Sequence, residues 1–211
     1  ELKRIGKQFG VHVKIVHSDM SQPLGYEAGL WNEVTEALAS LRGEGPDDLK
    51  QVTLELGSSL LLQSGNASSV DEAMEIQTQL ISNGKAMEKF VEMVAAQGGD
   101  ISVIENPKNY PAPAFEAEVI SNQDGFVSSM EMVGVGNLVN KLTIRHKNNK
   151  RLLEPTGGIR FLRKIGDNVS NGKPLAVCFG SNEDEVIGTA EELKSLIKIS
   201  EERVDPPPLF Y

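Results

Sequence analysis

The sequence of 211 residues lacks several features that would decide its class at once. It has a single cysteine, Cys178, which excludes an internal disulfide and fits a reducing compartment. No apolar run approaches the roughly 20 residues of a membrane span, and no signal peptide is visible. Positively charged residues are also relatively few: the chain has 21 Lys and Arg but 30 Asp and Glu, which gives a net charge of −9. This balance argues against nucleic acid or an anionic membrane as partner, and we expect a cytoplasmic protein.

The composition is that of an ordinary globular protein. Hydrophobic residues make up 39% and charged residues 24% of the chain, enough for one or two domains with a sizeable core. Cys178 lies in the apolar run Leu175–Phe179. We therefore expect a buried structural thiol there and not a nucleophile.

The first forty residues follow the pattern of an α/β sheet. Leu2–Gly10 predicts a short amphipathic helix, and the β-branched alternation of Val11–Val16 predicts a strand. In such sheets ligands bind beyond the carboxyl end of a strand. The loop Asp19–Gly29, rich in polar residues and glycine, is thus the expected binding region.

Further helices are predicted over 30–42, 47–64, 69–84 and 85–97. Ser69 and Glu72 form the pattern of a capping box at the third of these. The helix over 47–64 contains Leu60–Leu62 and is apolar nearly all round, so we expect it to be deeply buried.

A boundary is predicted at Asn106–Pro113, which contains three prolines. Beyond it the hydrophobic period changes to that of strands, followed by one more helix over 184–196. The expected strands are Phe115–Ile120, Gly125–Met130, Ile159–Lys164 and Leu175–Phe179. We predict an α/β fold in which residues 1–105 form part of an α/β domain and residues 106–211 a smaller α+β domain.

Several segments resemble, in order and spacing, the pyrimidine-nucleoside phosphorylases (thymidine phosphorylase and its relatives). They are Ser18–Gly25, Glu33–Ala37, Arg42–Leu49, Ala96–Asp100, Asp124–Val127 and Lys164–Asp167. The resemblance implies the C-terminal part of a mixed-sheet α/β domain followed by the C-terminal domain. The chain also opens inside a predicted helix without a Met, so we expect the missing N-terminal half to belong to the same protein.

The implied activity is that of a glycosyltransferase. Inorganic phosphate would attack C1′ of a pyrimidine nucleoside, releasing the base and a pentose 1-phosphate. In the family, the phosphate-binding loop and the residues that hold the base lie upstream. The resemblance therefore places no catalytic residue in this chain, which we expect to be inactive alone, and it implies a homodimer formed through the missing half.

A monovalent cation site is the one functional element that the resemblance places here. It implies a potassium ion bound by the backbone carbonyls of Leu24 and Glu27 and by the side chain of Glu36. Hard cations prefer oxygen ligands, and one carboxylate suits a single positive charge. From the residues alone, Glu36 could equally lie on a solvated helix face, because it is off the apolar stripe.

Two departures from the family pattern leave alternatives open. Gly29–Glu33 loses the usual asparagine, and Leu142–His146 replaces a glycine-rich loop. These changes allow an AMP-phosphorylase-like specificity or a non-catalytic interaction subunit.

The hairpin pattern Gly166–Gly172 is similar to that of lipoyl and biotinyl carrier domains, but Glu131 stands where a carrier needs lysine, so we expect no covalent cofactor. Val133–Gly136 is a glycine doublet without a dinucleotide fingerprint.

Overall fold

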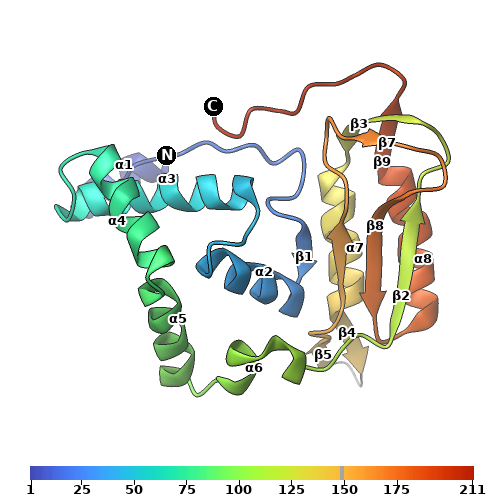
Figure 1. The fold of residues 1–211 in the computed structure, drawn as a ribbon, viewed down its shortest axis with the longest axis horizontal. Coiled ribbons are helices and arrows are strands. Elements are labelled where there is room, and N and C mark those ends of the chain that lie inside the picture. The colour runs from blue at the N-terminus through green and yellow to red at the C-terminus, as the bar shows by residue number, and fades with distance from the viewer. Residues whose placement is uncertain (148–149) are drawn as a thin grey trace.

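The fold is given by a computed structural model, which describes residues 1–147 and 150–211. Helices fill most of the first half and strands most of the second (Figure 1). The helices are α1 (Leu2–Gln8), α2 (Trp31–Leu41), α3 (Asp47–Ser64), α4 (Val70–Ser82), α5 (Lys85–Ala96), α6 (Ser102–Glu105), the 3₁₀ helix η1 (Pro107–Asn109), α7 (Met132–Thr143) and α8 (Glu183–Leu196). The strands are β1 (Glu27–Gly29), β2 (Phe115–Ile120), β3 (Gly125–Met130), β4 (Ile144–Lys147), β5 (Lys150–Leu153), β6 (Gly158–Phe161), β7 (Asn168–Val169), β8 (Pro174–Gly180) and β9 (Ile197–Ser200). This mixture confirms the α/β class.

The helices expected in the first half are confirmed. Those over 30–42, 47–64, 69–84 and 85–97 correspond to α2, α3, α4 and α5. Gly65 ends α3 with a φ of 74°, a left-handed conformation that glycine adopts without steric cost. At the start of α4, Ser69 Oγ accepts a hydrogen bond from the Glu72 amide at 3.2 Å. The Glu72 carboxylate reaches back to the Ser68 amide at 2.8 Å, so the capping box is present in a shifted form.

The strand predicted over Val11–Val16 is wrong for this structure. The segment runs as a coil between α1 and the following loop (Figure 1). A β-strand is defined by hydrogen bonds to a neighbour, and none of the sheets within the described residues includes this segment. The nearest pairing is a single bridge between Ser18 and Phe210 of the C-terminal tail. The alternation of residue types suggested a strand, but it could not show whether a neighbouring strand is present to pair with it.

The prediction that α3 is deeply buried is also wrong. Its buried residues are Ser58 and Ser59, whereas Leu56 is 47% and Leu60 68% exposed. The helix packs against α4 through its serine side, where Gln77 Nε2 donates to Ser58 Oγ at 3.0 Å. Of the leucines that suggested burial, Leu60 is exposed, and Leu61 and Leu62 are only half-buried.

The strands of the second half form an antiparallel framework. One sheet has the order β1–β6–β8–β2, a second has the order β7–β3–β9, and β4 pairs with β5. The four predicted strands are confirmed as β2, β3, β6 and β8, and the predicted helix as α8, with β6 ending at Phe161 instead of Lys164. Helix α7 was not predicted, and Leu142–His146 spans its end and the start of β4.

The first half contributes directly to the larger sheet. Glu27–Gly29 pairs with β6 in antiparallel register, with Ala28 opposite Ile159. The ring of Trp31 on α2 stacks on Tyr110, with centroids 4.0 Å apart. The domain division between residues 105 and 106 stays a prediction, and these contacts cross it.

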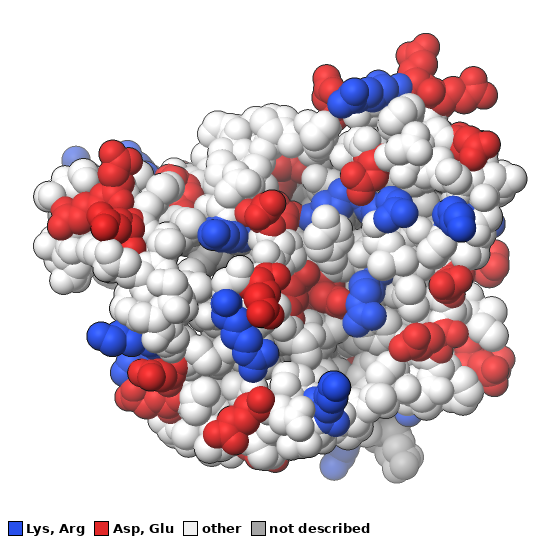
Figure 2. Space-filling model, viewed as in Figure 1, with Lys and Arg blue, Asp and Glu red and all other residues white. Residues whose placement is uncertain are grey.

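The surface carries charges of both signs. Figure 2 shows acidic and basic side chains interspersed over one face, without a continuous basic area. Among the described residues, no helix combines the length and apolar character that a bilayer crossing requires.

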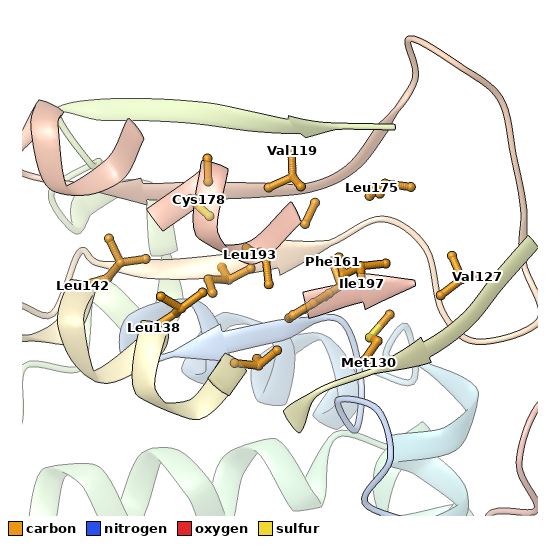
Figure 3. Close-up of a cluster of buried hydrophobic side chains, with 14 of the residues drawn as sticks. Val119, Val127, Met130, Leu138, Leu142, Phe161, Leu175, Cys178, Leu193 and Ile197 are labelled. Atoms are coloured by element: carbon orange, nitrogen blue, oxygen red, sulfur yellow. The ribbon is translucent and has the colours of Figure 1, made fainter. Parts of the chain in front are cut away.

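The hydrophobic core lies between the sheets and the helices α7 and α8 (Figure 3). Phe161, Ile159 and Leu193 are fully buried there. Cys178 points into the same cluster and has no exposed surface, which confirms it as a buried thiol. Burial raises the pKa of its thiol to about 12.

Candidate functional site

The loop Asp19–Gly29 lies between the coil that follows α1 and the start of α2. Its first residue is held by the C-terminal tail. The Asp19 amide donates to the Leu209 carbonyl at 3.0 Å, and the Tyr211 hydroxyl donates to the Asp19 carboxylate at 3.0 Å. The last three residues of the loop are β1, so they are fixed by the sheet. Both ends of the loop are thus anchored by the second half of the chain.

Glu36 projects from α2 onto this loop. Its Oε1 accepts a hydrogen bond from the Tyr26 amide at 2.8 Å. A Cβ added to Gly25 would clash with the Glu36 carboxylate, and Gly25 has a φ of 69°. The left-handed backbone conformation favours glycine at that position, and the Glu36 carboxylate occupies the space where a side chain would begin. Glu36 therefore packs against the loop and does not lie on a solvated helix face.

The electrostatic setting of Glu36 is unusual for a surface acid. Burial raises the pKa of this carboxyl, although the amides of Tyr26 and Glu27 favour its charged form. Among the described residues, no Lys or Arg lies within ion-pair distance of it. The charge of Lys164 acts on this carboxyl from beyond ion-pair distance. A half-buried carboxylate without an ion-pair partner is a position where a bound cation would be favourable.

The structure brings the three predicted cation ligands together. Leu24, Glu27 and Glu36 all line one pocket of about 540 Å³, whose other wall is formed by α7 through Met132, Val135 and Val139. The pocket therefore joins the loop, α2 and a helix that sequence reasoning did not anticipate. The residues present fit a monovalent cation, since carbonyl oxygens and one carboxylate are the donors that it prefers.

The side chain of Glu27 is occupied elsewhere. Its Oε1 accepts from Arg160 Nε at 2.5 Å and its Oε2 from Asn32 Nδ2 at 3.1 Å. Asn32 is buried, and its amide lies against Gly158, where a Cβ would meet it at 2.9 Å. This arrangement leaves the backbone carbonyl of Glu27 as the group that could serve a cation, as the resemblance implied.

Two charged residues at the loop were missed by sequence reasoning. Asp48 accepts from the Gly25 amide at 3.1 Å, and Lys164 donates to the Pro23 carbonyl at 2.9 Å. Both belong to segments that resembled the family, but Asp48 suggested a helix start and Lys164 the end of a strand. Because 116 residues separate them in sequence, no local pattern could have revealed their contact.

The remaining candidates gain no chemical role from the geometry. Glu131 caps α7 by accepting from the amides of Val133 and Gly134 at 3.2 and 2.7 Å. It is thus a helix-capping residue and not part of an exposed carrier hairpin. His12 is exposed on the coil after α1. Within the described residues, no cluster of three His, Cys, Asp or Glu side chains could hold a metal ion.

Comparison with known proteins gives a consistent result. No protein-family model matches the chain. It is 34% identical over 207 residues to a pyrimidine-nucleoside phosphorylase of Geobacillus stearothermophilus, covering 98% of this chain and 48% of that protein. Proteins of the same name from Bacillus subtilis and Staphylococcus aureus are 37% and 32% identical, covering 87% and 96% of this chain and 43% and 47% of theirs. The chain thus spans about half the length of the curated relatives it matches.

Proposed function

Because the chain belongs to the pyrimidine-nucleoside phosphorylase family, we propose that it forms part of an enzyme that cleaves pyrimidine nucleosides with phosphate. In the forward reaction a phosphate oxygen bonds to C1′ of thymidine or uridine while the bond from C1′ to the base nitrogen breaks. The base leaves with the electron pair of that bond and takes up a proton. The products are free base and a pentose 1-phosphate.

The observation that carries this proposal is the match along almost the whole chain to relatives of one name. The match includes the loop Asp19–Gly29, whose residues also meet in one pocket. The protein's task in such a reaction is to hold phosphate and nucleoside in line and to stabilise charge on the departing base.

The part proposed for this chain is to brace the phosphate site through a potassium ion. The carbonyls of Leu24 and Glu27 and the carboxylate of Glu36 would hold the ion. Support comes from their shared pocket and from the absence of an ion-pair partner for Glu36 within the described residues. When bound, the ion would order the segment that cradles phosphate, a segment that the resemblance places upstream.

The proposal also includes the oligomeric state, the compartment and the partners of the enzyme. A homodimer in the cytoplasm, formed through the other half of the protein, fits the family resemblance. Neither nucleic acid nor membrane is proposed as a partner, because the net charge is −9 and the surface lacks a continuous basic area on the face shown in Figure 2.

The test is phosphorolysis by the full-length protein. Thymidine, uridine and AMP are each incubated with and without phosphate, and the released bases are separated and quantified. Phosphate-dependent release of thymine or uracil is the expected result. Phosphate-dependent release of adenine from AMP, without release of base from thymidine or uridine, would indicate the AMP-phosphorylase-like specificity. No release from any of the three would favour a non-catalytic subunit.

A further inference from the structure

Three of the four consecutive loop residues Pro23–Tyr26 are held by groups from outside the loop. Lys164 donates to the carbonyl of Pro23 at 2.9 Å. Asp48 accepts from the amide of Gly25 at 3.1 Å, and Glu36 from that of Tyr26 at 2.8 Å. Leu24 is the remaining member, and its carbonyl shares a peptide unit with the amide of Gly25. The fixed neighbours therefore determine where this carbonyl points.

The geometry of the peptide bond makes this relation specific. In a trans peptide the C=O of one residue and the N–H of the next point in opposite directions within one plane. No peptide bond in the described chain is cis. When Asp48 receives the Gly25 N–H, the Leu24 carbonyl is consequently turned away from Asp48. Asp48 is thus the group that sets the direction of a proposed cation ligand without being a ligand itself.

Lys164 holds Asp48 in place. Its ammonium group forms an ion pair with Asp48 Oδ2, and its side chain is only 12% exposed. The same ammonium lies 4.9 Å from the centre of the Tyr26 ring, within the range of a cation–π contact. Burial disfavours the charged form of Asp48, but the hydrogen bond and charge of Lys164 outweigh it and lower the pKa of that carboxyl.

The turn that carries Lys164 is also fastened to the loop. The Ile165 amide donates to Gln22 Oε1 at 2.8 Å, and the Lys164 amide donates to Asp167 Oδ2 at 2.7 Å. The turn Lys164–Asp167 therefore meets the loop with a defined backbone geometry. A flexible surface lysine would lack these restraints.

We propose that Lys164 and Asp48 are a positioning pair that aims the Leu24 carbonyl at the cation site, so that the C-terminal part of the chain controls potassium affinity. This inference rests on the proposed function, because it concerns the same site. Neither residue contacts substrate in the proposal, and both act through the loop. The pair thus makes the turn Lys164–Asp167 a part of the site, although it is far from the loop in sequence.

The experiment compares variants of the full-length protein. Lys164→Met removes the ammonium but keeps much of the apolar stem, and Lys164→Arg keeps the charge. Removing one partner of a buried ion pair also destabilises the fold, because the other charge is left unpaired. The double variant Lys164→Met/Asp48→Leu removes both charges and so relieves that destabilisation. Lys173→Met, an exposed lysine on the turn before β8, is the matched control.

Two quantities are measured at constant ionic strength: the potassium concentration that gives half-maximal activation, and the potassium-dependent rise in melting temperature. In Lys164→Met the half-saturating concentration should increase about tenfold, the effect of one lost interaction, with kcat at saturating potassium within about twofold. The double variant should recover melting temperature but keep the weakened potassium affinity. Lys164→Arg should recover part of the affinity, and Lys173→Met should match the unmodified protein.

The outcomes distinguish a failure of the positioning role from a failure of the proposed function. If the unmodified protein shows phosphorolysis and responds to potassium but Lys164→Met responds identically, the positioning role is wrong and the proposed function stands. If the double variant regains both melting temperature and potassium affinity, the pair serves only folding. If the unmodified protein shows no response to potassium in either measurement, the cation site and the positioning pair are both rejected.

Discussion

At the scale of single residues, Glu36 is the side chain on which the proposed cation site depends. Its carboxylate lies against the loop at the Tyr26 amide and has no basic partner among the described residues. Replacing it with glutamine keeps the shape but removes the charge that would attract a cation. We expect Glu36→Gln in the full-length protein to raise the half-saturating potassium concentration by at least about tenfold. Activation titrations with potassium chloride at constant ionic strength would measure this.

Glu27→Gln is the matched comparison, since Glu27 would contribute only its backbone carbonyl. The amide oxygen of glutamine can still accept from Arg160, although its NH2 group cannot accept from Asn32; because the backbone carbonyl is kept, potassium activation should change by less than about threefold. Equal effects of the two substitutions would mean that the assignment of one side-chain ligand is wrong. An unchanged response in Glu36→Gln would make Glu36 an ordinary helix residue.

Cys178 provides a second prediction at this scale. With a pKa of about 12 and no exposed surface, only about one thiol in ten thousand is ionised at pH 8. A thiolate-specific reagent should therefore fail to label the native protein at pH 8 within an hour. The same reagent should label one thiol per chain after denaturation. Rapid labelling of the native protein would show that the core around Cys178 opens readily.

At the scale of elements, the start of α4 can be tested directly. Ser69 Oγ accepts from the Glu72 amide, one of the unpaired donors at the helix start. We expect Ser69→Ala to lower the free energy of unfolding by about 1 kcal/mol. Urea denaturation followed by circular dichroism would measure it. Ser170→Ala, at an exposed serine after β7, should change stability by less than about 0.5 kcal/mol.

Elements with complete local signals could be predicted from the sequence. α3 begins after Pro46 with two acidic residues and ends at Gly65, and α4 begins at the capping residue Ser69. β2 and β3 alternate between turns. α7 escaped prediction because Gly134 and Gly136 weaken its helix signal, whereas its stability comes from packing against α8. Strand β1 has only three residues, too few for a period to be recognised. Its existence depends on pairing with β6, in which Ala28 lies opposite Ile159, far along the chain.

Some residues of the candidate site could likewise be predicted from the sequence, and others could not. The loop and Glu36 were found because they lie close together in sequence and resemble a known family. Lys164 and Arg160 were not found as site residues, because they reach the loop only through the folded arrangement of turn and sheet. The Val11–Val16 error has the same origin, since a strand requires a neighbour that local patterning cannot specify.

At the scale of the whole molecule, most of the exposed large apolar side chains lie in the first half of the chain. Leu2, Phe9 and Leu60 are 75%, 79% and 68% exposed, and Val11–Val16 joins no sheet within the described residues. The curated relatives are about twice as long as this chain. We expect the other half of the protein, which the resemblance places upstream, to cover these faces and to pair with Val11–Val16.

Hydrogen exchange tests this expectation. In the 211-residue chain alone, the amides of Val11–Val16 should exchange at rates near those of an unstructured peptide, because few backbone hydrogen bonds protect them. When the upstream half is added, exchange over Val11–Val16 should slow by at least about a hundredfold, while exchange in β8 should be unchanged. Strong protection of Val11–Val16 in the isolated chain would contradict the coil conformation of this segment. A lack of protection in the mixture would mean that the upstream half docks elsewhere.

The most direct test of the account is phosphorolysis by this chain with and without its upstream half. The separately produced halves are assayed alone and mixed, with thymidine or uridine, phosphate and potassium, and the free base is quantified. The chain alone should release no thymine or uracil above background, because the groups that cradle phosphate and hold the base are expected upstream. The mixture should release base in a phosphate-dependent way. Release by the 211-residue chain alone would contradict the account, and so would an inactive mixture in which the two halves demonstrably associate.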